Sequence, residues 1–284
     1  MATCTAPQAY DSPDSGTASV SGSCWDQAGN RTDRAFTFKY DSTAPQVTSA
    51  TPARGTDANG WYDHPLSVSF AGTDATSGVE SCSQPTYTGP DSATASLSGS
   101  CRDRAGNVSP SNGFPFKYDA TGPQVTNAIA ARPSDRGGWY NHPVVFAIQG
   151  VDATAGIESC PPSMYSGPAG ANAAVIGSCV DKAGNRGVSS FGLAYDATGP
   201  QVSAVPSRGP DAHGWYNHAL TVNLDGSDAV SGLGSCGTPQ SYDGPDSAFS
   251  TIVGWCSDKA GNVGLASFAL RYDATAGTVG TSTP

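Results

Sequence analysis

The sequence has little charge and lacks several features that mark large classes of protein. Charged residues make up 13% of the 284 residues, and only two glutamates occur, Glu80 and Glu158. The 14 basic residues against 24 acidic ones give a net charge of −10. This balance argues against nucleic acid, which needs clustered basic side chains. No apolar run approaches the ~20 residues that span a bilayer, so we expect no membrane insertion in this segment. The first ten residues also lack the basic start and apolar core of a signal peptide.

A repeat of roughly 77 residues dominates the sequence. GWYDHP begins at Gly60, GWYNHP at Gly138 and GWYNHA at Gly214. KYDSTAPQVT, KYDATGPQVT and AYDATGPQVS recur at the same spacing. We therefore expect three full modules, called here the first, second and third full copies, at 44–121, 122–198 and 199–275. Residues 1–43, the partial copy, match only the second half of the repeat, and 276–284 is expected to begin a further module or form a disordered tail. We expect the segment to be cut from a longer array, which makes the missing signal peptide uninformative.

The hydrophobic pattern predicts strands, because glycine and proline interrupt the chain too often for long helices. In LSVSF, Leu66, Val68 and Phe70 alternate with polar residues and share one face. Before the second cysteine of each copy, Leu97, Gly99 and Cys101 or their equivalents share a face as well. Several short alternating strands per copy indicate an all-β sandwich with the second cysteine on its buried face.

Each copy carries two cysteines, spaced about 20 residues apart. The eight cysteines allow 105 pairings in principle, but the repeat favours one disulfide inside each module. The expected pairs are Cys4–Cys24, Cys82–Cys101, Cys160–Cys179 and Cys236–Cys256. A loop of this length closed by a disulfide stabilises a domain by about 3 kcal/mol in the entropic description. Zinc would need closely spaced ligands such as C-x₂₋₄-C pairs, which are absent; free thiols are the other alternative. Disulfides imply an oxidising compartment, hence an extracellular or cell-surface location.

The order of motifs GWYNHPVVFAIQGVDATAGIESC, YSGP, CVDKAGN and AYDATGP resembles bacterial immunoglobulin-like repeats. These tandem repeats, related to fibronectin type III domains, occur in secreted and surface-anchored proteins. The resemblance covers nearly the whole chain and implies a sandwich of about seven strands per module. It also implies that D-K-A-G-N forms the hairpin turn into the closing strand. Such modules serve as spacers, adhesins and glycan binders, so the fold does not decide the function.

A Trp-Tyr pair opens a strand in each full copy. These aromatic pairs could stack against sugars as possible glycan-binding platforms, or the tryptophan could plug the sandwich. The pairs are Trp61 with Tyr62, Trp139 with Tyr140, and Trp215 with Tyr216. The histidines that follow, His64, His142 and His218, are expected on the surface.

Recurring aspartates are the candidates for calcium. They open the D-A-x-x-G motifs, end the copies, or stand in D-K-A-G-N, as Asp181 does beside Asn185. Calcium bound where such acids meet at a junction could stiffen the array, but it normally needs six or more oxygens. Asp and Asn also close turns by bonding their own backbone. We therefore expect turns and no cofactor, with calcium as the alternative. The weak candidates are Asp74, Asp119, Asp152, Asp196, Asp228 and Asp273.

Nothing in the sequence indicates catalysis. A triad needs a convergent, non-repeated site, and a glycosidase needs paired carboxylates, yet the third full copy has Gly234 where Glu80 and Glu158 stand. We expect a non-catalytic repeat region of an extracellular bacterial protein. It would act as a spacer, stalk or adhesive array that meets an extracellular protein or glycan surface. The alternative is an array of carbohydrate-binding modules that use the Trp-Tyr pairs. Residues 1–43 lack the early strands and are expected to be less stable, or to pair their open edge with another chain.

Overall fold

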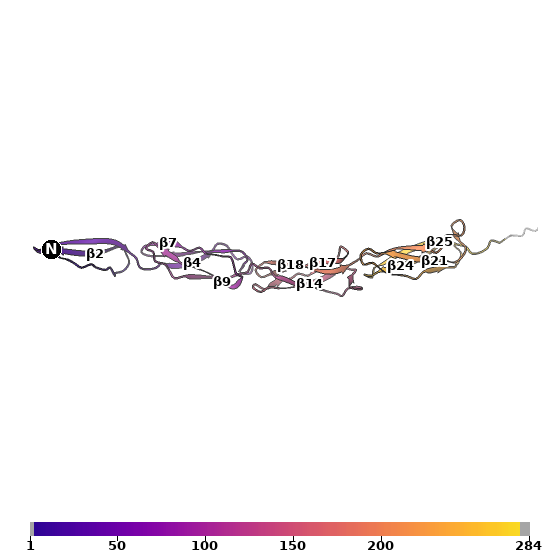
Figure 1. Cartoon of the computed structure of the whole chain (residues 1–284), viewed down its shortest axis with the longest axis horizontal. Helices are drawn as coiled ribbons and strands as arrows, with labels where there is room; N and C mark the ends of the chain where they lie inside the picture. The colour runs from indigo at the N-terminus through magenta and orange to yellow at the C-terminus, as the bar shows by residue number, and fades with distance from the viewer. Residues whose placement is uncertain (1–2, 279–284) are drawn as a thin grey trace, which may run out of the picture. The chain divides into compact units, whose positions relative to one another are not determined.

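The computed structural model describes residues 3–278, in which strands and turns occur and no helix does (Figure 1). Within that range there is accordingly no helix with the length and apolarity to cross a membrane. The all-β class predicted from the alternation is confirmed, with tandem β-sandwich repeats. By contacts the chain divides into two compact units. Unit 1 holds Met1–Pro123, Asp152–Glu158 and Val180–Arg186, and unit 2 holds Gln124–Val151, Ser159–Cys179 and Gly187–Pro284.

The partial copy forms one antiparallel sheet of three strands, β1, β2 and β3, whose long hairpin carries the label β2 in Figure 1. Its strands are β1 (Thr3–Cys4), β2 (Ser15–Trp25) and β3 (Arg31–Tyr40). The D-Q-A-G-N segment makes the turn between the long strands, and Val20 lies opposite Phe36 in the register. Because only one layer is present, the apolar face of this hairpin has no second sheet from its own copy.

The first full copy has two layers with the core between them. One layer contains β4 (Gln46–Pro52), β6 (Leu66–Thr73) and β8 (Thr86–Tyr87). The other contains β5 (Trp61–Tyr62), β11 (Asn112–Tyr118) and β9 (Ser92–Gly99), and β7 (Val79–Cys82) pairs with β10 (Cys101–Asp103). The core consists of Tyr62, Leu66, Val68, Phe70, Ala95, Leu97, Phe116 and Tyr118. The face predicted for LSVSF is therefore the buried one.

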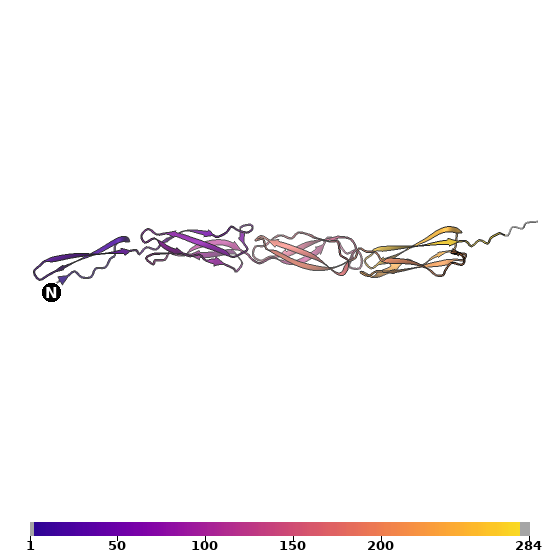
Figure 2. The ribbon, with the colours of Figure 1, turned by 90° about the horizontal axis from the view of Figure 1, so that it is seen from above.

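The second and third full copies repeat this arrangement, and Figure 2 shows the strand layers of the third in orange and yellow. The second copy pairs β12 (Gln124–Ala130), β14 (Val144–Val151) and β16 (Ser163–Tyr165) in one sheet. Its other sheet holds β13 (Trp139–Tyr140), β18 (Arg186–Tyr195), β17 (Gly170–Asp181) and β15 (Ile157–Ser159). The third copy pairs β19 (Gln201–Pro206), β21 (Leu220–Ser227) and β23 (Gln240–Tyr242). Its other sheet holds β20 (Trp215–Tyr216), β25 (Val263–Tyr272), β24 (Ser247–Asp258) and β22 (Leu233–Cys236).

A glycine precedes the second cysteine by two residues in every copy, and in the full copies close packing explains it. A Cβ added at Gly99 would lie 2.1 Å from the ring of Phe70 in the facing sheet. At Gly177 it would lie 2.8 Å from Ile148, and at Gly254 2.3 Å from Leu224. The missing side chain thus makes room for the third apolar residue of the opposite strand, and any substitution there would push the two sheets apart.

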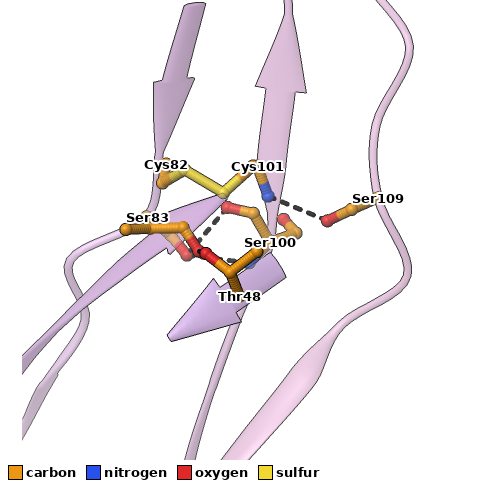
Figure 3. The surroundings of a disulfide bond; sticks show 7 residues. Thr48, Cys82, Ser83, Ser100, Cys101 and Ser109 are labelled. Carbon is orange, nitrogen blue, oxygen red and sulfur yellow. Dashed lines mark hydrogen bonds between the residues drawn. A yellow bond between two sulfur atoms is a disulfide. The ribbon is translucent and has the colours of Figure 1, made fainter. Parts of the chain in front are cut away.

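Four disulfides join the cysteine pairs expected from the repeat. In the partial, first and third copies the paired cysteines face each other across neighbouring antiparallel strands, so these bonds lie within a sheet and do not link the two layers. Figure 3 shows the bond of the first full copy, where the Cys101 amide donates to Ser109 Oγ at 2.9 Å. Cys101, Cys179 and Cys256 are buried, whereas Cys24 is exposed.

Candidate functional site at the junctions between copies

Each D-x-A-G-N turn is closed by the carboxylate of its own aspartate. In the first full copy, Asp103 Oδ1 accepts the amides of Gly106 at 2.7 Å and Asn107 at 2.8 Å. Asp103 Oδ2 accepts the Asn107 side-chain amide at 2.8 Å. The backbone of Gly106 has φ +100°, a conformation that favours glycine. Asp181 with Asn185 and Asp258 with Asn262 make the same pair of contacts. The motif is thus a turn, as expected from its residue types.

The asparagine of this turn also reaches the end of the preceding copy. Asn185 Nδ2 donates to the carbonyl of Asp119 at 2.9 Å, and Asn262 Nδ2 donates to the carbonyl of Asp196 at 2.8 Å. Asn107 Nδ2 makes the equivalent bond to Asp41 at 3.2 Å. The two residues of each bond are 66 positions apart in the chain. One side chain therefore stabilises its own turn and holds the copy before it.

The aspartate that ends a copy makes a second bond to the next copy through its carboxylate. Asp119 Oδ2 accepts the amide of Ala155 at 2.8 Å, inside the D-A-T-A-G motif. At the other two junctions the carboxylates of Asp41 and Asp196 accept the amides of Ser77 and Ser231, at 2.9 and 3.0 Å. Both motifs of a copy thus bond to the same terminal aspartate, which agrees with the grouping of Asp152–Glu158 and Val180–Arg186 with the residues before Pro123.

These contacts bring three carboxylates together at every junction, with oxygens within 4.8 Å of one another. The clusters are Asp41, Asp74 and Asp103; Asp119, Asp152 and Asp181; and Asp196, Asp228 and Asp258. Five of the six weak calcium candidates lie in these clusters, and Asp273 lies in none among residues 3–278. The other four members, Asp41, Asp103, Asp181 and Asp258, stand in the Y-D and D-x-A-G-N motifs, for which calcium was the alternative to a turn.

The aspartates Asp119 and Asp196 occupy equivalent positions but differ in acidity. Burial raises the pKa of Asp119, and the neighbouring charge of Asp152 raises it further. Burial also acts on Asp196, but hydrogen bonds from Thr198 and Ser231 outweigh it and hold the pKa below its usual value. The Thr198 hydroxyl donates to Asp196 Oδ1 at 2.6 Å. The second full copy has Ala155 where the third has Ser231, so a missing hydroxyl accounts for part of the difference.

The three carboxylates of each junction would suit calcium, because this hard cation prefers carboxylate oxygens as ligands. Backbone amides, however, already bond both oxygens of Asp119, and Asp152 Oδ1 accepts the amides of Thr154 and Gly156. Asp181 uses both oxygens on Asn185. Such donors stabilise a buried carboxylate without a metal ion. The expectation of no cofactor, with calcium as its alternative, stays a prediction.

The Trp-Tyr pairs divide between two environments, because adjacent residues of a strand point to opposite sides. Tyr62 is part of the sandwich core, whereas Trp61, 6% exposed, packs against Ala155 and Ala183 of the second full copy. The sandwich is therefore plugged by Tyr62, and Trp61 fills the junction, which differs from the expected plugging by tryptophan. Trp139 and Trp215 are half-buried. The glycan-platform hypothesis is untested and stays a prediction.

Each full copy also presents an exposed histidine, and the first and second full copies make a second asparagine bond across a junction. The side chains of His64, His142 and His218 are 72%, 73% and 77% exposed. Asn59 Nδ2 donates to the carbonyl of Lys182 at 3.0 Å, and Asn141 Nδ2 donates to that of Ala260 at 3.0 Å. Comparison of the copies could not predict these bonds, because Asn59 and Asn141 do not occupy equivalent positions of the repeat.

No protein-family model matches the chain, and no curated protein matches it. Among solved structures it is similar to a tetra-tandem repeat in the extending region of a large adhesion protein. The two share 15% sequence identity with a TM-score of 0.28, over 91% of this chain and 82% of the other. At such values the likeness carries no argument about this chain.

Proposed function

We propose that the chain is a non-catalytic repeat region of an extracellular bacterial protein and that it acts as a spacer or stalk. The motif resemblance supports immunoglobulin-like modules and a bacterial source. The four disulfides support an oxidising, extracellular location. Repetition also allows weak contacts to add up by effective concentration, which fits an adhesive role toward an extracellular protein or glycan surface.

The observation that carries the proposal is the pair of hydrogen bonds that each full copy makes to the terminal aspartate of the copy before it. At Asp196 the carbonyl accepts from Asn262 and the carboxylate accepts from Ser231, and the side chain is fully buried. Bending at the junction would break both bonds and leave a still partly buried carboxylate without these donors, which costs free energy. The connection is also short, since β18 ends at Tyr195 and β19 begins at Gln201, with Pro200 between them. A spacer needs this resistance to bending.

Backbone ¹⁵N relaxation of the whole chain tests the proposal, because it reports whether two copies tumble together. The second and third full copies of the wild-type chain should share one rotational correlation time. The double variant Asn141→Ala/Asn262→Ala removes both side-chain amides that bond across this junction and should shorten the correlation time of residues 199–275. Independent tumbling of these copies in the wild-type chain would contradict the spacer proposal.

Asn30→Ala is the matched control. Asn30 bonds Asp26 as Asn262 bonds Asp258, at 2.8 and 2.7 Å, so the control loses the same bond within its turn. The structure gives Asn30 no side-chain bond to another copy among the described residues. Its replacement should leave the correlation times of the full copies unchanged.

The carbohydrate-binding alternative has less support, because the faces of Trp61 and Tyr62 are 6% and 4% exposed and offer little area to a sugar. Trp139 and Trp215 are half-buried and leave more of their surface open to a sugar. A glycan array with the wild-type chain and Trp139→Ala separates the two functions. Binding that the substitution abolishes would support glycan recognition, and no binding would remove it.

A further inference from the structure

The third full copy has an outward face of β24 and β25 that is strongly apolar. Ile252, Gly254 and Cys256 point inward and are buried, so their neighbours on β24 point outward. Trp255 lies directly opposite Leu265 of β25 in the register. The outward apolar residues, called here the β24–β25 face, are Phe249, Val253, Trp255, Val263 and Leu265. Their exposed fractions are 88%, 60%, 45%, 57% and 70%.

The fold does not require apolar residues at the β24 positions of this face, as the other copies show. Counting back from the second cysteine, the first full copy has Thr94, Ser98 and Ser100 where the third has Phe249, Val253 and Trp255. The second full copy has Asn172, Ile176 and Ser178 there. The same strand therefore forms with polar outward residues, so the fold does not need large apolar side chains there. Within its own copy the Trp255 indole lies over Gly237, and the rest of its surface is exposed.

The area of this face matches what an interface needs. With ~150–250 Å² for a whole aromatic side chain, the five residues expose on the order of 500 Å² of apolar surface. One side of a standard interface buries about 800 Å², of which roughly 56–65% is apolar. The face thus supplies about the whole apolar share of one side. Patches of this size on a monomer are commonly functional.

We propose that the β24–β25 face binds the same face of a second copy of this chain. Charge does not block this occupant: each chain carries a net charge of −10 and two chains repel overall, but the strands of this face present no exposed acid. Within β24 and β25 the charged residues are Asp258, which is fully buried, and Arg271 near the strand end. Two flat sheet faces stack about 10 Å apart, and a twofold axis lets Trp255 and Leu265 contribute on both sides.

Sedimentation equilibrium between about 1 and about 100 µM chain tests the inference. The wild-type mass should rise from that of the 28.7 kDa chain toward twice that value. The variant Phe249→Thr/Val253→Ser/Trp255→Ser places the residues of the first full copy on the β24–β25 face. Because that copy folds with them, the variant should fold and its dimer dissociation constant should rise by about 100-fold or more. Circular dichroism melting checks that it is folded.

Two further variants assign the interface. Ile176→Ser removes an apolar side chain, 63% exposed, at the equivalent face of the second full copy and should leave the dimer intact. Phe36→Ser removes an aromatic, 67% exposed, from the open hairpin of the partial copy and should also leave it intact. A monomer at 100 µM, a dimer that survives the triple variant, or a dimer lost with Phe36→Ser overturns the inference. The mass does not depend on how the copies tumble, so this inference and the spacer proposal can fail separately.

Discussion

The partial copy and the first full copy share the same closing half of the repeat, but only the full copy buries it. Phe116 is 9% exposed and Tyr118 3%, whereas their counterparts Phe38 and Tyr40 are only partly covered. Phe36 is 67% exposed. The turn contacts of the aspartate and the disulfide are nevertheless present in both regions, although the hairpin strands are continuous in the partial copy and interrupted in the first full copy. The comparison teaches that these local features form from their own residues, while burial needs the facing sheet of β4, β6 and β8.

Shortening a core side chain of the facing sheet should have the largest effect. Leu66 has no exposed surface, so Leu66→Ala should destabilise the first full copy by about 2–5 kcal/mol. Val20→Ala, on the half-buried face of the partial copy, should cost about 1 kcal/mol or less. Hydrogen exchange measures the two regions separately, and in the wild-type chain the amides of β2 and β3 should exchange faster than those of β9 and β11. Equal protection in both hairpins would contradict the claim that the facing sheet stabilises only the full copy.

Removing a disulfide should have the next largest effect. Cys82→Ala/Cys101→Ala opens a loop with a sequence separation of 19 and should destabilise its copy by about 3 kcal/mol. In the wild-type chain, Cys24 is exposed and Cys101 is 1% exposed, so a thiolate reductant should reach the Cys4–Cys24 bond first. Alkylation of the native protein at low reductant, followed by peptide mass mapping, identifies the first bond to open. First labelling of Cys82 and Cys101 would contradict this order.

Replacing the turn aspartates should give a smaller difference in stability between the second full copy and the partial copy. Asp181, 1% exposed, accepts two bonds from Asn185, and Asp181→Asn should cost about 1–3 kcal/mol because a buried donor loses its acceptor. Asp26 accepts the equivalent bonds from Asn30, but it is exposed and water can replace them. Asp26→Asn should therefore leave the hairpin's urea midpoint nearly unchanged. Urea titration followed by NMR signals of each copy compares the two variants, and similar shifts in both would be the contrary result.

Acid should remove the stabilisation that the turn aspartates Asp26 and Asp103 give to the two regions. Hydrogen bonds from Asn30 lower the pKa of Asp26; burial opposes the shift at Asp103, but bonds from Asn107 and the turn amides outweigh it and lower that pKa too. A carboxyl whose folded pKa lies below its usual value near 3.8 stabilises the fold above about pH 4, and that contribution is lost as the pH falls further. Urea midpoints measured from pH 6 downward should fall below about pH 4. Midpoints that rise on acidification would refute it.

Calcium should have the smallest effect. The amides that bond Asp119 and Asp181 already stabilise their charges, so the melting temperature should be the same with calcium and with EDTA. The partial copy and the full copies should respond alike. A higher melting temperature with calcium, lost in Asp152→Asn, would instead identify the junction clusters as calcium sites.

Much of the fold was predictable because its signals are local. Alternation placed Leu66, Val68 and Phe70 on the buried face, and the repeat identified the cysteine pairs. The turn role of D-x-A-G-N followed from residue types that bond their own backbone. The junction was less predictable. The bond from Asn185 to Asp119 joins residues 66 positions apart, and no spacing rule within a strand or turn indicates such a partner.

The sequence by itself determined the all-β repeats, the strand faces, the turns and the disulfide pairing, because each depends on residues close together in the chain or on comparison between copies. Only the tertiary structure decided that Trp61 lies against Ala155 and Ala183, and that three aspartates from two copies share each junction. Tertiary structure also joined the exposed Val253 and Trp255 of β24 to Leu265 of β25 in one continuous face. These features depend on which surfaces meet when sheets and copies pack, and that is a property of long-range contacts.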